Sequence, residues 1–279
     1  MNSSELLSVV TFIYGISAFL YVASWVFKKQ TPAKIAKWAG ILAVAANLAG
    51  FILRWVESYR LGIGHAPLSN MYESLVFFAM TIGVIYLFIE QRYHSAIIGV
   101  FSMPIAFLAM AYASLSPSVS DRIQPLIPAL KSNWLIAHVI TCFFGYAAFA
   151  VAFGISILYL MKQKGTDEKS GLRSHLPGAG FLDELTHRMV LFGFLFLTIG
   201  IITGAVWANS AWGTYWSWDP KETWSLITWF IYATLLHARM MRGWHGKKIA
   251  YLSIIGFVAV LFTYFGVNYL PGLHSYGAS

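Results

Sequence analysis

The sequence predicts an all-α, polytopic membrane protein with about eight transmembrane helices. Hydrophobic residues make up 58% of the 279 residues and charged residues only 11%, whereas a soluble domain has about 25% charged residues. Long charge-poor segments recur along the whole chain. These segments are too long for strands and do not alternate between apolar and polar residues, so we expect helices.

The charge-poor segments place the helices. A spanning helix needs about 20 predominantly apolar residues. Eight segments come close to that length: 6–27, 38–56, 72–89, 95–114, 134–161, 189–208, 222–240 and 249–269. The loops between them are too short for separate folded domains, so we expect a single transmembrane domain over residues 1–279.

The positions of lysine and arginine predict the orientation. With the N-terminus outside, 14 of the 19 basic residues fall in cytoplasmic loops: Lys28, Lys29, Lys34, Lys37, Arg92, Lys162, Lys164, Lys169, Arg173, Arg188, Arg239, Arg242, Lys247 and Lys248. The positive-inside rule therefore predicts that both termini are extracytoplasmic. The net charge of +8 reflects this bias and does not indicate nucleic-acid binding. We expect the first helix to be retained, because it lacks the basic lead and the cleavage site of a signal peptide.

Tryptophan is concentrated in one segment, residues 207–224, which we expect on the outer side. Residues 212–222 read WGTYWSWDPKE, and seven of the eleven tryptophans lie between Trp207 and Trp244. Pro220 suits the first position of a helix, with Asp219 as its N-cap. Capping accounts for the carboxylates of Asp219 and Glu222 but not for the tryptophans. The simpler alternative is an interfacial aromatic loop that anchors helix ends.

The eight histidines separate by their expected depth. His138 and His274 fall on the outer side, where the tryptophan segment emerges, whereas His237 lies deep toward the inner leaflet. A planar metal macrocycle needs axial nitrogens, aromatic cover and polar groups for its carboxylates. We therefore interpret His138 and His274 as candidate ligands, although a helix histidine is more often a structural, hydrogen-bonded group. His65 also falls outside, and the rest are expected to be solvated in or beside cytoplasmic loops: His94, His175, His187 and His245.

The tryptophan segment resembles a known signature. WGTYWSWDPKETWSLITW is similar to the WWD signature of heme-handling proteins in cytochrome c maturation. The segments HAPLSNMYES at 65–74 and LLHARMMRGW at 235–244, with the eight-helix count, resemble the CcsA/ResC branch of system II.

This resemblance implies a set of site residues. His138 and His274 would be the axial ligands of heme b (iron protoporphyrin IX) at an external site. His237 would bind heme at a second position, with the other ligand supplied by a CcsB/ResB partner. The residues implied to bind the cofactor are Trp212, Trp216, Trp218, Asp219, Lys221, Glu222 and Trp224. For the propionates we consider Lys221 first and Arg54 and Arg60 next; a solvated Lys221 is the alternative.

The resemblance also implies a function. The family exports heme, keeps it reduced and presents it for thioether attachment to the CxxCH cysteines of apocytochrome c. The chain would be a membrane subunit of a cytochrome c heme lyase complex, in a bacterial inner (cytoplasmic) membrane or, if plastid-encoded, a thylakoid membrane. A thioredoxin-like thiol reductase would act indirectly, since Cys142 is the one cysteine and is expected to be a small buried residue.

The sequence leaves three readings of the function open. The chain could catalyse attachment or only deliver heme. It could also be a heme-binding or heme-delivery protein without synthetase activity, as in system I. A non-heme solute transporter is the third reading. We expect it to need paired intramembrane charges, whereas Asn47 and Glu73 look isolated.

Overall fold

The computed structural model describes residues 2–163 and 176–272. Within these ranges the chain forms eight α-helices and three short 3₁₀ helices, without a strand. Seven of the eight α-helices are long and apolar enough to cross a membrane. The prediction of an all-α membrane protein with about eight helices is therefore confirmed.

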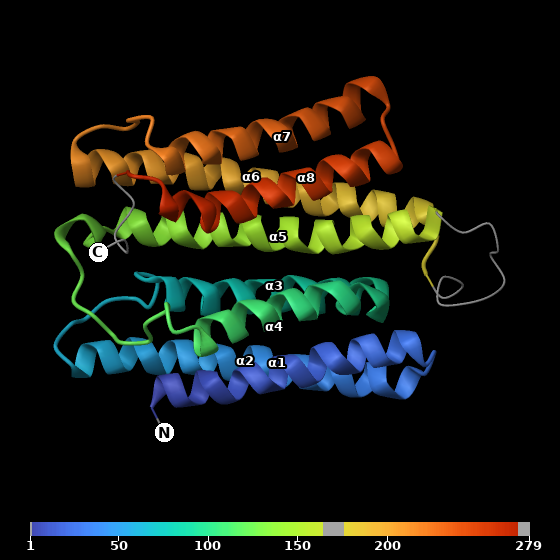
Figure 1. Ribbon diagram of the computed structural model, residues 1–279, viewed down its shortest axis with the longest axis horizontal. Helices are drawn as coiled ribbons and strands as arrows, with labels where there is room; N and C mark the ends of the chain where they lie inside the picture. Colours follow the sequence, from blue (N-terminus) through green and yellow to red (C-terminus); the bar gives the residue numbers. More distant parts are fainter. Residues whose placement is uncertain (1, 164–175, 273–279) are drawn as a thin grey trace. The chain divides into compact units, whose positions relative to one another are not determined.

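The helices form two compact units of four, in each of which they run alongside one another (Figure 1). The first unit contains α1 (Ser3–Val26), α2 (Gln30–Arg60), α3 (Met71–Tyr93) and α4 (Gly99–Leu115), with η1 (Ala96–Ile98). The second contains η2 (Pro128–Leu130), α5 (Asn133–Gln163), α6 (Ala179–Trp212), α7 (Pro220–Arg242), α8 (Lys247–Tyr264) and η4 (Gly266–Tyr269). That the two units act as a single domain stays a prediction.

In the first unit, α1 packs against α2 and α4, and α3 packs against α2 and α4. Its interior holds charged groups that are paired. Arg54 Nε lies 2.8 Å from Glu73 Oε1, and both side chains are buried. A buried charge is tolerated only with such a partner. The expectation that Glu73 is isolated is therefore wrong, because its partner lies 19 residues earlier on another helix. Asn47 is partly satisfied: its Nδ2 donates to Val76 O at 3.2 Å, whereas its buried Oδ1 has no hydrogen-bond partner among the described residues.

In the second unit, α5 packs along α6, α8 packs on α5 and α7, and α7 packs on α6. One carboxylate joins three of these helices at one end. Asp183 of α6 accepts from Arg239 Nη1 of α7 at 2.7 Å and from Gly246 N, directly before α8, at 2.8 Å. This pairing fixes the end of α7 against its neighbours.

Two helices are longer than the sequence predicts. α6 begins at Ala179 rather than near 189, and α2 begins at Gln30 rather than near 38. Charge-poor spans identify only the apolar part of a helix, whereas charged turns can continue it through pairs such as Arg188 with Glu184, at 2.9 Å. The expectation that His187 is a solvated loop residue is therefore wrong: it lies in α6, and its Nδ1 is buried without a hydrogen-bond partner in the described ranges.

Candidate functional site

The turn between α6 and α7 is built by the two carboxylates of the tryptophan segment. Asp219 accepts a hydrogen bond from Lys221 N at 2.9 Å. Glu222 reaches back to accept from Asp219 N at 3.2 Å and from Ser217 N at 2.8 Å. These bonds form a capping box with Pro220 at the start of α7. The prediction that Asp219 is the N-cap is confirmed, and both carboxylates are engaged in shaping the turn.

This turn holds Trp218 in an unfavourable backbone conformation. Its φ of 61° lies in the left-handed region, which costs an L-residue about 1–2 kcal/mol. The Trp218 side chain is 69% exposed, and its ring meets that of half-buried Trp216 edge-on at 5.8 Å. Strain of this kind persists only where the surroundings over-determine it. The indole of Trp218 is therefore held in an exposed position between α6 and α7.

A second pair of tryptophans connects the turn to α5. Trp212, the last residue of α6, meets the buried Trp207 edge-on at 4.8 Å. Trp207 is fixed in turn, because its Nε1 donates to Ala129 O at 2.8 Å. Its ring is stacked on the imidazole of His138, with centroids 6.1 Å apart and planes 11° apart. The structure therefore brings His138 to the tryptophan segment.

The hydrogen bonding of His138 defines which ring nitrogen is free. Its Nδ1 lies 2.7 Å from Gly200 O. A carbonyl oxygen can only accept, so Nδ1 carries the proton and Nε2 of the neutral ring keeps its lone pair. Metal-ligating histidines are held in this way, with one ring nitrogen donating to a carbonyl while the other binds the metal.

The fit of His138 against α6 depends on Gly204. A Cβ at Gly204 would lie 2.6 Å from His138 Nδ1. The sulfur of Cys142, a buried free cysteine, lies 3.6 Å from the same nitrogen, which confirms the expected small buried role. Sequence reasoning missed the contribution of Trp207 to this site. The sequence could have indicated it through the spacing of Gly200, Gly204 and Trp207. This spacing places two residues without side chains and one indole ring on the same face of the helix.

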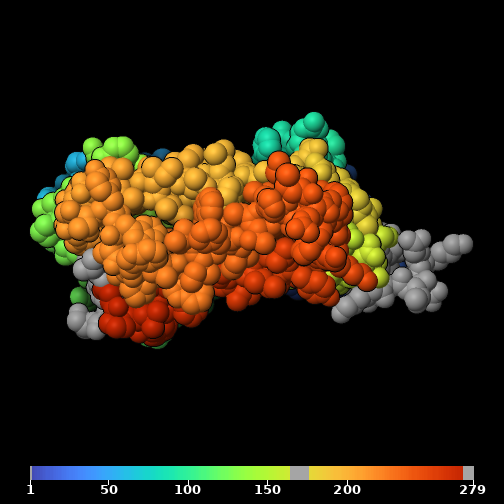
Figure 2. All heavy atoms as spheres, turned by 90° about the horizontal axis from the view of Figure 1, so that it is seen from above, coloured from blue at the N-terminus to red at the C-terminus, as the bar shows by residue number. Residues whose placement is uncertain are grey.

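The remaining predicted residues take other positions. Lys221 is half-buried in the first turn of α7, and Trp224 packs on Phe262 with ring centroids 4.2 Å apart. His237 is exposed on α7 and forms no hydrogen bond with another described residue. Figure 2 shows α7, in orange, on the surface of its unit. His274 lies outside the described residues, but Gly272 lies against the Asp219 carboxylate.

The described part of the chain offers no cluster of three or more His, Cys, Asp or Glu side chains that could hold a metal ion. The oriented imidazole of His138 lies beside Trp207, which contacts Trp212, and an imidazole next to aromatic rings suits a metal that arrives with its own macrocycle.

Comparison with known proteins decides the family. The profile of the family described as cytochrome C assembly protein matches residues 68–274, which include the tryptophan turn. The chain belongs to the CcsA family. It is 40% identical to the cytochrome c biogenesis protein CcsA of Guillardia theta over 99% of this chain and 96% of that one. It is 38% identical to CcsA of Synechococcus sp. (strain RCC307), over 98% of this chain and 97% of the relative.

A solved structure shares the fold. The chain is similar to the cytochrome c heme lyase CcmF, with a TM-score of 0.73 and 16% sequence identity. The alignment covers 95% of this chain and 47% of CcmF, so the chain spans about half the length of that protein. The resemblance to the CcsA family is confirmed, and the chain is an integral membrane protein of cytochrome c biogenesis.

Proposed function

We propose that this CcsA-family chain carries heme b at an outer site and presents it, reduced, for attachment to the CxxCH cysteines of apocytochrome c. Heme is the cargo of the proposed reaction. The observation that carries the proposal is the orientation of His138, whose Nδ1 is tied to Gly200 O at 2.7 Å. The lone pair of Nε2 is thereby available to iron, without a rotamer search that would cost conformational entropy.

The tryptophan turn supplies aromatic cover for the proposed cargo. Trp212, Trp216 and Trp218 are the half-buried and exposed rings of the turn, and Trp224 extends the series into α7. Flat contact between an apolar ring and an indole is favourable in proportion to the area removed from water. Lys221 is the proposed partner of a propionate. Asp219 and Glu222 contribute by holding the turn, because their oxygens already accept backbone hydrogen bonds.

His274 is the proposed second axial ligand. Gly272 lies against Asp219, the N-cap of the tryptophan turn. Two neutral imidazoles would occupy both axial positions and limit access of oxygen to the iron. The CxxCH histidine of the substrate would then displace one of them.

His237 is proposed to serve a second, inner heme position used during export. It lies 18 residues after Asp219 along continuous α7, about 27 Å away at 1.5 Å per residue, so it cannot share the outer heme. Its exposed side chain on the surface of α7 is open to a ligand from a neighbouring CcsB/ResB subunit. A thioredoxin-like reductase would keep the substrate thiols reduced, since Cys142 is buried.

The proposal places the tryptophan turn and both termini on the extracytoplasmic side. The membrane would be the bacterial inner membrane, or the thylakoid membrane for a plastid-encoded chain. The buried Arg54–Glu73 pair removes the argument that a solute transporter is excluded by a lack of paired charges. Membership of the CcsA family argues against a solute transporter instead.

The test is an absorption spectrum of the full chain purified with and without a CcsB/ResB partner. We expect a low-spin, bis-histidine spectrum for the complex. His138→Ala should lower heme content and make it recover on addition of imidazole, which replaces the missing ligand. His94→Asn is the matched control, because His94 is exposed and left-handed, a conformation that asparagine accepts. Unchanged heme content and spectrum in His138→Ala would overturn the assignment.

A further inference from the structure

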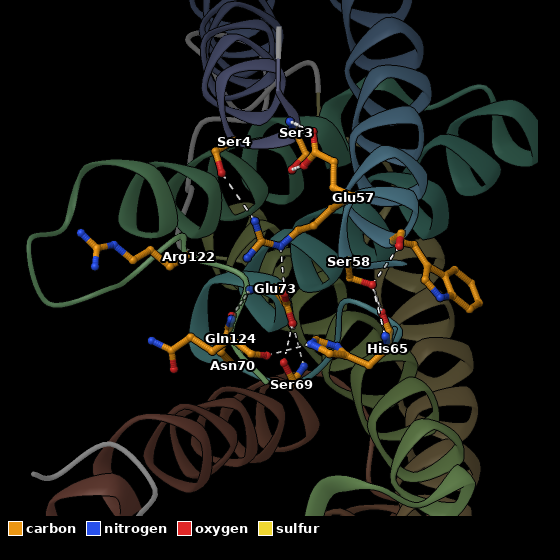
Figure 3. A network of polar contacts seen from close by, with 12 residues as sticks. Ser3, Ser4, Glu57, Ser58, His65, Ser69, Asn70, Glu73, Arg122 and Gln124 are labelled. Atoms are coloured by element: carbon orange, nitrogen blue, oxygen red, sulfur yellow. Dashed lines mark hydrogen bonds and ion pairs between the residues drawn. The ribbon is translucent and has the colours of Figure 1, made fainter. Parts of the chain in front are cut away.

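A pocket lined mainly by polar and charged residues lies at one end of the first unit. Its lining includes Arg54 and Arg60, which the sequence ranked behind Lys221 as partners for heme propionates. Its volume is about 540 Å³, within the usual range for small-molecule sites. Three segments surround it: the first turn of α1, the last two turns of α2, and the segment after α4. Figure 3 shows Ser3, Ser4, Glu57 and Arg122 around this end of the unit. The predicted orientation places this end on the outer side of the membrane.

Three arginines line the pocket. Arg54, Glu57 and Arg60 share one face of α2 because they are spaced by three residues, and Arg122 approaches from the segment after α4. Arg60 and Arg122 are exposed and form no ion pair with a described residue. Their guanidinium groups are therefore not neutralised by a carboxylate of the described residues.

The carboxylates near the pocket are mostly occupied. Glu57 accepts from Ser3 N at 2.9 Å and also from Ser3 Oγ. Glu73 faces Arg54 Nε and in addition accepts from Ser69 N at 2.9 Å. Asp121 is the one lining carboxylate without a hydrogen bond to a described residue. With Glu73 included, the charges balance, so binding would depend on the arrangement of donors rather than on net charge.

The floor of the pocket has spare donor capacity. Arg54 is 2% exposed and its Nη1 reaches Ser4 Oγ at 3.5 Å, which is long for a hydrogen bond. Its Nη2 is buried without a hydrogen-bond partner in the described ranges. Asn2, Ser3 and Ser4 place the N-terminus of α1 on the same wall, and the dipole of a helix N-terminus favours an anion. Two amides there already donate to carboxylates, Asn2 N to Glu5 and Ser3 N to Glu57.

The outer wall of the pocket is held by His65. Its Nε2 lies 3.0 Å from Gln124 O and its Nδ1 lies 2.9 Å from Ala66 O. Gln124 directly follows the lining residues Asp121, Arg122 and Ile123. The ring of His65, which is buried, thus ties this segment to the connection between α2 and α3. This gives a positioning role to a histidine that sequence reasoning left without one.

We propose that this pocket binds the phosphate oxyanion of a ligand at the outer membrane boundary. Guanidinium groups recognise phosphate oxygens through paired, charge-assisted hydrogen bonds. The same chemistry suits the headgroup of an anionic phospholipid and free inorganic phosphate, and the two sources give different results in the test. This site is independent of the heme proposal and can stand if that proposal fails.

The test uses the full chain in neutral detergent, titrated with inorganic phosphate or with short-chain phosphatidylglycerol at constant ionic strength. A ligand that binds the folded state raises the unfolding temperature. We expect the double variant Arg60→Gln/Arg122→Gln to need about tenfold more ligand for the same rise, because two charge-assisted contacts are lost. Both side chains are exposed, so the variant should fold normally. Arg92→Gln, an exposed arginine of the same unit outside the pocket, is the control.

The outcomes separate the two sources. A response to phosphatidylglycerol alone identifies a lipid headgroup, and a response to inorganic phosphate as well identifies a free-anion site. His65→Asn should weaken the response without removing an arginine. The proposal is overturned if neither ligand stabilises the protein, or if the double variant and Arg92→Gln respond as the unmodified chain does.

Discussion

At the scale of single residues, the orientation of His138 depends on one glycine. A Cβ at Gly204 would lie 2.6 Å from His138 Nδ1, closer than side-chain atoms approach. Gly204→Ala should therefore push the imidazole away from Gly200 O and lower heme retention, which is measured by the heme-to-protein ratio after gel filtration. Gly180→Ala in the same helix meets no atom within 4 Å and should leave that ratio unchanged. Equal ratios in the two variants would show that the fit at Gly204 is unimportant.

Trp218 gives a prediction in which two substitutions differ in stability but lose heme retention equally. Glycine accepts a φ of 61°, so Trp218→Gly should be more stable than Trp218→Ala by about 1 kcal/mol. Both variants lose the indole, and aromatic stacking on a planar ligand is worth about 1–3 kcal/mol, so heme retention should fall by about tenfold in each.

Thermal unfolding and heme retention are measured on the same Trp218 preparations. Trp38→Ala is the control, because Trp38 is 71% exposed and lies in α2, outside the tryptophan segment. If Trp38→Ala lowers heme retention as much as Trp218→Ala, the segment is only an interfacial anchor.

The residue-level predictions from sequence succeeded where the contact is local. The sequence Asp-Pro-Lys-Glu determines the capping box because all four positions lie within one helical turn. The bond of His138 to Gly200 joins residues 62 positions apart, and no periodicity in the sequence reports the pairing of two helices at that depth. Arg54 and Glu73 are a second example: the sequence shows that both are charged residues near apolar helices, but not that they form an ion pair.

At the scale of elements, the start of α7 distinguishes a cap from a ligand contact. Asparagine caps a helix about as well as aspartate, whereas alanine costs about 1 kcal/mol. If Asp219 acts by capping, Asp219→Asn should keep both the unfolding temperature and the heme content, and Asp219→Ala should lower both. Heme loss in Asp219→Asn at normal stability would instead indicate that the negative charge itself contacts the cargo.

The bounds of a helix were predicted accurately where its ends carry clear sequence signals, and poorly where charged turns extend it. The predicted span 222–240 lies within two residues of α7 at each end, because the capping sequence and the arginines limit it. The predicted span 189–208 misses ten residues at the start of α6. Those residues carry Asp183 and Glu184, whose charges are neutralised by Arg239 and Arg188. A criterion based on hydropathy assigns charged residues such as these to loops, because it does not consider that they form ion pairs.

At the scale of the whole molecule, the two proposed heme positions predict an asymmetry. His237→Ala should empty the outer position as well as the inner one, because heme could no longer be delivered from the cytoplasmic side. His138→Ala should leave heme at the inner position. Both variants are co-expressed with a CcsB/ResB partner, and their heme content is read from pyridine hemochrome spectra. If His237→Ala keeps heme at the outer position and still matures cytochrome c, His237 does not bind heme.

The predicted orientation can be tested with the natural cysteine in place. Cys142 is buried and should not react with a membrane-impermeant maleimide. Ser118→Cys, in the exposed segment after α4, should be labelled from the extracytoplasmic side, whereas Gln91→Cys, exposed near the end of α3, should not. Labelling in the reverse pattern would invert the topology and place the tryptophan turn in the cytoplasm.

The composition of α7 bears on how the protein is made. α7 is not among the helices apolar enough to span a membrane unaided, and its Arg239 is satisfied by Asp183 of the preceding helix. A nascent α7 released alone into lipid would expose a bare guanidinium, at a cost of about 2.5–3.5 kcal/mol if it lay at the bilayer centre. Insertion as a hairpin with α6 removes that cost. We therefore expect the ion pair to assist insertion of α7, so that Asp183→Asn should lower the amount of inserted protein, measured in isolated membranes, before it alters heme binding.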